Sequence, residues 1–155
     1  MEKMDARKRY TQMVLKQSFL KLLKEKPVNR ITVKEVCALA QLNRATFYAH
    51  YSDCFALMES IENELIDAFE KSLRYVNLFD VTALIEAIYD MVDQNQDACR
   101  VLILGNTSAT VLMRMIALAK EESIAYWRKE LPYADETELE MMYTHLSNGL
   151  MHVVV

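Results

Sequence analysis

The sequence predicts an all-α fold, and three observations lead to that prediction. Among 155 residues there are only 2 Gly and 2 Pro, although average usage is roughly 7% and 5%. Ala, Leu, Met, Glu and Lys, which favour helices, are common throughout. Apolar residues recur every three or four positions, which is the spacing of an amphipathic helix. With 52% hydrophobic residues, the chain is long enough to bury a core.

The N-terminal third of the chain begins with two predicted helices. The first covers residues 5–25 and ends before Pro27. Its apolar face consists of Val14, Leu15, Ser18, Phe19, Leu22 and Leu23. The second begins after Thr32, because Thr32 and Glu35 have the spacing of a capping box, in which each caps the other. Its inward face consists of Val33, Val36, Cys37 and Ala40.

A third, short helix follows a tight turn at Gln41 and Leu42, with Asn43 as its N-cap. At about 100° per residue, Phe47 and Tyr51 point to one side of this helix and anchor it to its neighbours. The other side carries small residues and hydrogen-bond donors, namely Arg44, Ala45, Thr46, Tyr48, Ala49 and His50. Such a face can approach a polar, anionic surface closely.

Charge divides the chain sharply. Residues 1–52 hold 11 Lys and Arg against 4 Asp and Glu, whereas the remainder holds 7 against 18. The net charge of -4 is therefore the sum of a basic N-terminal segment, residues 1–52, which we call the head, and an acidic remainder, residues 53–155, which we call the body. The asymmetry indicates that the head meets a polyanion while the body stays away from it. The alternative is that the charges only solvate the surface.

A short capped helix, a tight turn and a second short helix, preceded by a supporting helix, form a helix-turn-helix, whose second helix enters the DNA major groove. The segment ITVKEVCALAQLNRATFYAHYSDCFAL resembles the DNA-binding head of TetR-family bacterial transcriptional regulators, and the resemblance covers residues 11–57. It implies that Thr32 and Lys34 touch phosphates, that Arg44, Ala45 and Thr46 reach base edges, and that Tyr48 and His50 clamp phosphates. The implied DNA-binding set is Thr32, Lys34, Asn43, Arg44, Ala45, Thr46, Tyr48 and His50.

Two positions depart from that family's pattern. Gln41 stands where a turn glycine is usual, so either it adopts a left-handed conformation at a cost of about 1 kcal/mol or the turn shifts slightly. Cys54 replaces a lysine that usually contacts phosphate. With Ser52 as the expected N-cap of the next helix, the Cys54 thiol could be acidified and sense oxidants; a neutral substitution is the alternative.

The remaining chain predicts further helices. A long one over residues 53–75, roughly 34 Å in length, joins the head to a body with helices over residues 80–94, 97–104, 108–130 and 136 to the C-terminus. The predicted domains are therefore a DNA-binding domain at 1–52 and an effector-binding and dimerisation domain at 53–155.

The body loosely resembles the small C-terminal domains of one TetR-like group, in helix count and in the pattern YDMVDQNQDACRVLILGN. That resemblance implies a homodimer formed by the last two helices of each subunit. The last helix independently carries an apolar stripe that a small monomer would expose. This expected dimer interface comprises Leu139, Met142, Tyr143, Leu146, Leu150 and Val153.

Flexible and aromatic apolar residues in the body raise the question of a ligand pocket. The expected pocket for a small apolar effector is lined by Met58, Ile61, Leu65, Tyr89, Met113 and Trp127. The alternative is that these methionines fill irregular gaps in a helical core.

Several classes of protein are not indicated. Two isolated glycines cannot build a phosphate-binding loop, and no catalytic constellation can be named, so an enzyme and a cofactor are not expected. Cys37, Cys54 and Cys99 are too far apart for a sequence-local zinc site, and His145 and His152 lack a third donor, so no metal site is expected. Without an apolar leader or spanning segment, the chain is expected in the cytoplasm and away from membranes.

Together these patterns predict a dimeric, sequence-specific regulator of transcription that binds operator DNA, a repressor released by a small-molecule effector. The alternative is an adaptor on the same fold, with a filled core, that binds a protein partner and no small molecule.

Overall fold

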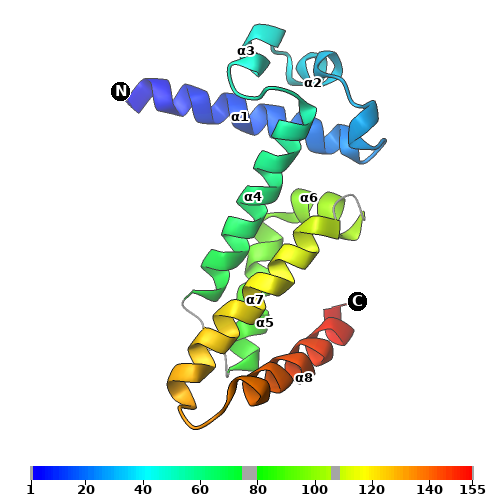
Figure 1. Cartoon of the computed structure of the whole chain (residues 1–155). Coiled ribbons are helices and arrows are strands. Elements are labelled where there is room, and N and C mark those ends of the chain that lie inside the picture. Colours follow the sequence, from blue (N-terminus) through cyan, green and yellow to red (C-terminus); the bar gives the residue numbers. More distant parts are fainter. Residues whose placement is uncertain (1, 75–79, 106–108, 155) are drawn as a thin grey trace. The chain divides into compact units, whose positions relative to one another are not determined.

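A computed structural model describes the backbone of residues 2–74, 80–105 and 109–154, and all regular structure in these ranges is helical (Figure 1). The chain divides into two compact units. One comprises Met1–Asp67 with Gln94–Val111, and the other comprises Ala68–Asp93 with Leu112–Val155. The all-α prediction is confirmed.

Helix α1 (Glu2–Leu23) supports the first unit and is followed by a 3-10 turn at Val28–Arg30. Four residues of the predicted apolar face of α1 are buried, namely Leu15, Ser18, Phe19 and Leu23, and the other two, Val14 and Leu22, are half-buried. Leu20, which was not predicted to lie on this face, is buried as well. The helix ends four residues before Pro27, which has no N–H to donate and fixes an extended backbone at its own position.

Helix α2 (Val33–Ala40) begins at the predicted capping box. The Thr32 hydroxyl accepts a hydrogen bond from the Glu35 N–H at 3.3 Å, and the Thr32 N–H donates to Glu35 Oε2 at 2.9 Å. The helix ends at Gln41, whose φ of 55° and ψ of 38° are the predicted left-handed values. Val36, Cys37 and Ala40 are buried on its inner face.

Helix α3 (Arg44–Tyr48) and helix α4 (Cys54–Leu73) follow. Asn43 caps α3 as predicted, since its side chain accepts from the Thr46 N–H at 2.7 Å. The prediction of Ser52 as the cap of α4 is wrong. Asp53 caps this helix, because its Oδ1 accepts from the Ala56 N–H at 2.8 Å and Ser52 lies one position too early.

The first unit also contains α6 (Gln96–Ala98) and the π-helix η2 (Cys99–Leu104). One α-helix was expected over residues 97–104, and this expectation is wrong in type. The Gly105 N–H donates to the Arg100 carbonyl at 2.9 Å, which is the wider i→i−5 bond of a π-helix. Lys24 at the end of α1 pairs with Asp97 of α6 at 2.7 Å.

The second unit contains the end of α4, α5 (Val81–Gln94), α7 (Ala109–Glu130) and α8 (Glu136–Val154). Helices α7 and α8 are joined by ion pairs of Lys120 with Glu140 at 2.8 Å and Arg128 with Glu136 at 3.0 Å. The core of this unit includes Phe69, Leu73, Met91, Met115, Trp127 and Leu139.

Candidate nucleic-acid interface

Two aromatic side chains fix the orientation of α3 in the first unit. Phe47 is fully buried and Tyr51 is 7% exposed. Their ring centroids lie 5.9 Å apart, and the Tyr48 ring meets Phe47 edge to face at 5.7 Å. Aromatic pairs at these separations stabilise one another beyond their buried area. The inner side of the short helix is therefore anchored as the sequence predicted.

The opposite side of α3 faces outward. Arg44, Ala45 and Tyr48 are exposed, and Thr46 and His50 are half-buried. Tyr48 leaves 57% of its surface accessible although its ring touches Phe47. Asn43, the N-cap of this helix, is exposed too, so the six predicted contact residues of this segment lie on one short, accessible stretch, with small Ala45 allowing close approach.

The cap of α3 limits what two of its residues can do. Both the N–H and the hydroxyl of Thr46 donate to Asn43 Oδ1, at 2.7 and 2.9 Å. The hydroxyl proton of Thr46 is therefore engaged, so this side chain presents an acceptor oxygen and a methyl group to a partner. Asn43 keeps only its amide N–H groups for an outside acceptor.

At the start of α2, the Thr32 hydroxyl is already hydrogen-bonded, whereas the Lys34 side chain is exposed. The Thr32 hydroxyl donates to Glu35 Oε2 at 2.8 Å, and Lys26 Nζ contacts Glu35 Oε1 at 2.5 Å. These bonds from Lys26 and Thr32 lower the pKa of Glu35 from 4.5 to about 2. Lys34 is exposed and forms no ion pair among the described residues.

The imidazole ring of His50 has one buried nitrogen. Its Nδ1 is buried, and no hydrogen-bond partner for it lies among the described residues. An outside partner would therefore contact the other ring nitrogen, Nε2, in the tautomer that has its proton there. Nε2 is then a donor, which is the polarity that a phosphate oxygen requires.

Solved structures with a similar arrangement are transcriptional regulators. A regulator of the TetR/AcrR family from Aquifex aeolicus VF5 matches with a TM-score of 0.65 and 15% identity over 93% of this chain and 84% of its own. A TetR transcriptional regulator from Streptococcus agalactiae 2603V gives 0.61 and 23% over 90% and 80%. A putative transcriptional regulator from Pseudomonas aeruginosa PAO1 gives 0.59 and 19% over 92% and 76%.

The chain has the TetR-family fold. The resemblance predicted from the helix-turn-helix segment is confirmed in the fold.

One relative in sequence matches only part of the chain. The uncharacterised HTH-type transcriptional regulator YxbF of Bacillus subtilis (strain 168) is 30% identical over 59 residues, which is 38% of this chain and 16% of that protein. The chain thus spans only a small part of the relative that it matches. No family model matches the chain.

Cys54 of this TetR-fold chain is not an acidified thiol. The side chain is 6% exposed, and burial together with the neighbouring Asp53 carboxylate raises the pKa of the Cys54 thiol. Burial likewise raises the pKa of Cys37 and Cys99. A raised pKa lowers the thiolate fraction that reacts with oxidants, which favours the neutral-substitution alternative.

The predicted pocket residues of this TetR-fold chain are divided between the two units. Met58, Ile61 and Leu65 lie on α4 in the first unit, and Ile61 and Leu65 are buried. Trp127 is buried in the second unit, whereas Tyr89 and Met113 in that unit are exposed by 70% and 65%. A shared pocket for these six residues stays a prediction.

Helix α8 has one face turned inward and one turned outward. Leu139 is buried, and the Tyr143 hydroxyl donates to the Ile116 carbonyl of α7 at 3.0 Å. Leu139 and Tyr143 both belong to the predicted dimer interface, and both pack or hydrogen-bond within their own unit. The side chains of Leu150, Val153 and His152 lie outside the described residues.

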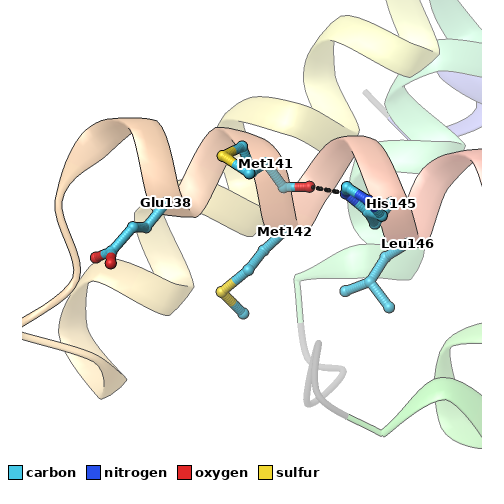
Figure 2. A pocket seen from close by; sticks show the side chains of 5 residues that line it. All are labelled: Glu138, Met141, Met142, His145 and Leu146. Carbon is cyan, nitrogen blue, oxygen red and sulfur yellow. Dashed lines mark hydrogen bonds between the residues drawn. The ribbon is translucent and has the colours of Figure 1, made fainter.

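The outward face of α8 forms an open hollow of about 450 Å³ (Figure 2). Its lining includes Met142 and Leu146 of the predicted stripe, and the full set is Glu138, Met141, Met142, His145 and Leu146. His145 Nδ1 lies 2.9 Å from the Met141 carbonyl on the same helix. No group of three potential metal ligands occurs among the described residues, and no described helix is long and apolar enough to cross a membrane.

Proposed function

We propose that this TetR-fold protein is a homodimeric, sequence-specific regulator of transcription, a repressor that a small-molecule effector releases from operator DNA. The observation that carries the proposal is the outward face of α3. It combines an exposed cation, a small residue and an exposed tyrosine on a helix whose other side is buried. A helix of that kind fits the second position of a helix-turn-helix, which enters the major groove.

Base and phosphate contacts are assigned to different residues of the head. Arg44 stands at the N-terminal end of α3, where recognition helices reach base edges, and its guanidinium can bind the O6 and N7 atoms of guanine together. Tyr48, Lys34 and the Nε2 of His50 present donors suited to phosphate oxygens. Because Thr46 presents an acceptor and a methyl group, we assign it to a base that offers an amino or methyl group.

Assembly is proposed through the outward face of α8. Met141 and Leu146 are exposed by 57% and 42% there, and Met142 lies between them in the hollow. A two-fold interface needs such a self-complementary apolar face. Two heads would then read half-sites about 34 Å apart or a multiple of that spacing. Binding of DNA and action in the cytoplasm follow from the same proposal.

The deciding experiment is a selection of bound duplexes from a random-sequence pool, followed by titration of the wild-type chain and Arg44→Ala. We expect Arg44→Ala to flatten the preference among sequences by roughly 1 to 3 kcal/mol at the base that it reads. Tyr48→Phe should instead weaken binding to all duplexes by a similar factor.

Lys71→Ala, which removes an exposed cation from α4 in the second unit, is the control for loss of charge alone. If Arg44→Ala keeps both the affinity and the selected sequence of the wild-type chain, the assignment of α3 to the major groove is wrong. If the wild-type chain binds no duplex at all, the whole proposal is wrong.

A further inference from the structure

The N-terminal part of α1 extends from the head without packing against it. Every residue from Ala6 to Tyr10 is exposed, so more than a full helical turn has no buried side. Among the described residues of α1, the first buried side chain is Leu15. At 1.5 Å per residue, Arg7 lies about 12 Å along the axis from that position. We call residues 6–10 the basic overhang, and Figure 1 shows this end of α1 running on past α3.

Two of the lysines that follow the basic overhang in the chain are paired within the unit. Lys16 pairs with Glu64, and Lys24 pairs with Asp97, so these charges are neutralised within the unit. Arg7 and Lys8 form no ion pair among the described residues. The sequence places them directly before a third basic residue, Arg9.

An unpacked helical turn also receives no tertiary stabilisation. Most helical stability in proteins comes from packing of an apolar face, and short exposed segments are marginal by themselves. Tyr10 adds a large ring that is 64% exposed on this turn. A segment that is basic, exposed on all sides and extended from the core is suited to a polyanionic partner.

We propose that the basic overhang is a second DNA-contacting element, which binds phosphates beside the half-site through Arg7 and Lys8. This inference rests on the proposed function, because it assumes that α3 lies in the major groove. The groove is about 12 Å wide, which is comparable to the distance of about 12 Å between Arg7 and Leu15 along the axis of α1. Flexible cationic side chains bind phosphates without reading the sequence.

The proposal predicts a change in salt dependence rather than in sequence preference. Each phosphate contact contributes about 0.9 to the slope of log affinity against log salt concentration. Arg7→Gln/Lys8→Gln should therefore reduce that slope by about 2 per head. It should also weaken binding to selected and to random duplexes by the same factor. The selected base sequence should not change.

The matched control is Lys71→Gln/Lys129→Gln, which removes two exposed cations from α4 and α7 in the second unit. Affinity for a selected and a random duplex is titrated from 50 to 300 mM NaCl for all three chains. The control should keep the wild-type slope. The charge-conserving variant Arg7→Lys/Lys8→Arg should also keep it, which excludes a loss of folding as the cause. Hydrogen exchange of the amides of residues 8–12 should slow when DNA is added.

The outcomes separate this inference from the proposed function. If the wild-type chain binds DNA and the Arg7→Gln/Lys8→Gln variant has an unchanged slope, the basic overhang does not touch phosphates and only this inference fails. If the control variant loses as much slope as the overhang variant, the effect is one of net charge and this inference also fails. If the wild-type chain binds no duplex, the proposed function fails, and this inference fails with it.

Discussion

At the scale of single residues, Gln41 shows how a turn can override a side chain's preference. Its φ of 55° lies in the left-handed region, where a residue with a Cβ is strained by about 1 kcal/mol or more relative to glycine. The turn is retained because the Gln41 N–H bonds to the Ala38 carbonyl and the Leu42 N–H bonds to the Cys37 carbonyl at 2.9 Å. These bonds satisfy carbonyls at the end of α2.

Replacement of Gln41 by glycine should relieve that strain. Gln41→Gly is expected to be neutral or to stabilise the protein by up to about 1 kcal/mol, whereas Gln17→Gly within α1 should destabilise it by about 1 kcal/mol. Both changes lose the same side chain, so the difference between them isolates the backbone effect. Urea unfolding of the two variants measures it. Equal destabilisation of both would contradict the left-handed assignment.

Glu35 predicts a pH dependence. Its folded pKa of about 2 lies below the ordinary 4.5 because the carboxylate accepts hydrogen bonds from Lys26 and Thr32. A lowered folded pKa stabilises the protein above the unfolded pKa, and this stabilisation is lost as the pH falls from about 4.5 to about 2. Glu35→Gln should therefore lower the Tm at pH 7 and flatten its fall over this range.

The control for this experiment is Glu25→Gln, at an exposed position beyond the end of α1. Its Tm curve between pH 7 and pH 2 should run parallel to that of the wild-type chain. A Glu35→Gln curve that also runs parallel to the wild-type curve would show that the interactions of Glu35 with Lys26 and Thr32 do not contribute to stability.

At the scale of whole elements, the capping residues explain where most helices of the head begin. Thr32 and Asn43 were identified from sequence because side-chain acceptors at fixed spacing before an apolar run are local signals. The same rule failed at α4, where Ser52 and Asp53 are adjacent acceptors and local spacing does not choose between them. The choice follows from the backbone, since the Ala56 N–H points to Asp53.

A pair of substitutions tests that choice. Asp53→Ala should destabilise the protein by about 1 kcal/mol, because it leaves a helix N–H without its cap and removes a negative charge from the positive end of α4. Ser52→Ala, one position earlier, should cost only a few tenths of a kcal/mol. Chemical denaturation of both variants gives the two values. The reverse order would restore Ser52 as the cap.

The π-helix η2 was not predictable from the pattern of residues. The segment Cys99–Leu104 has the apolar spacing of an ordinary helix, and π-helical bonding has no distinct local signature. The wider ring is closed by the Gly105 N–H on the Arg100 carbonyl. Cys99, Val101 and Leu102 of this helix are buried.

At the scale of the whole molecule, the proposal of a homodimer depends on the outward face of α8. Leu146→Glu would place like charges near the two-fold axis of such an interface and should yield monomers that bind DNA weakly, because one head contacts only a half-site. Thr144→Glu, at another exposed position of α8, is the control. Sedimentation at micromolar concentration measures the oligomeric state. A wild-type monomer under these conditions would exclude this interface.

Effector control is tested at Ile61, which is 4% exposed on α4. If the expected pocket exists, Ile61→Trp should fill it, leaving the Tm and basal DNA affinity nearly unchanged and abolishing the response to effector. If the core is filled, as the adaptor alternative requires, the same change should overpack it and destabilise the protein by about 1 to 3 kcal/mol. Thermal unfolding beside a DNA titration distinguishes the two.

Local patterns in the sequence are enough to predict the all-α class, the helix-turn-helix, its caps at Thr32 and Asn43, and the inward side of α3. These features depend on local spacing, because capping, left-handed turns and helical faces are decided within a few residues. The sequence therefore predicts Phe47 and Tyr51 in the core and Arg44 and Tyr48 at the surface, as the structure has them.

Which charged side chains form ion pairs, and which apolar side chains pack within the chain, depends on the tertiary structure. Pairing of Lys16 with Glu64 and of Lys24 with Asp97 joins residues far apart in the chain, which no local pattern shows. The inward turn of Leu139 and Tyr143 on α8 likewise depends on contact with α7. An apolar stripe specifies that a helix face is buried, but the partner that buries it is set by long-range packing.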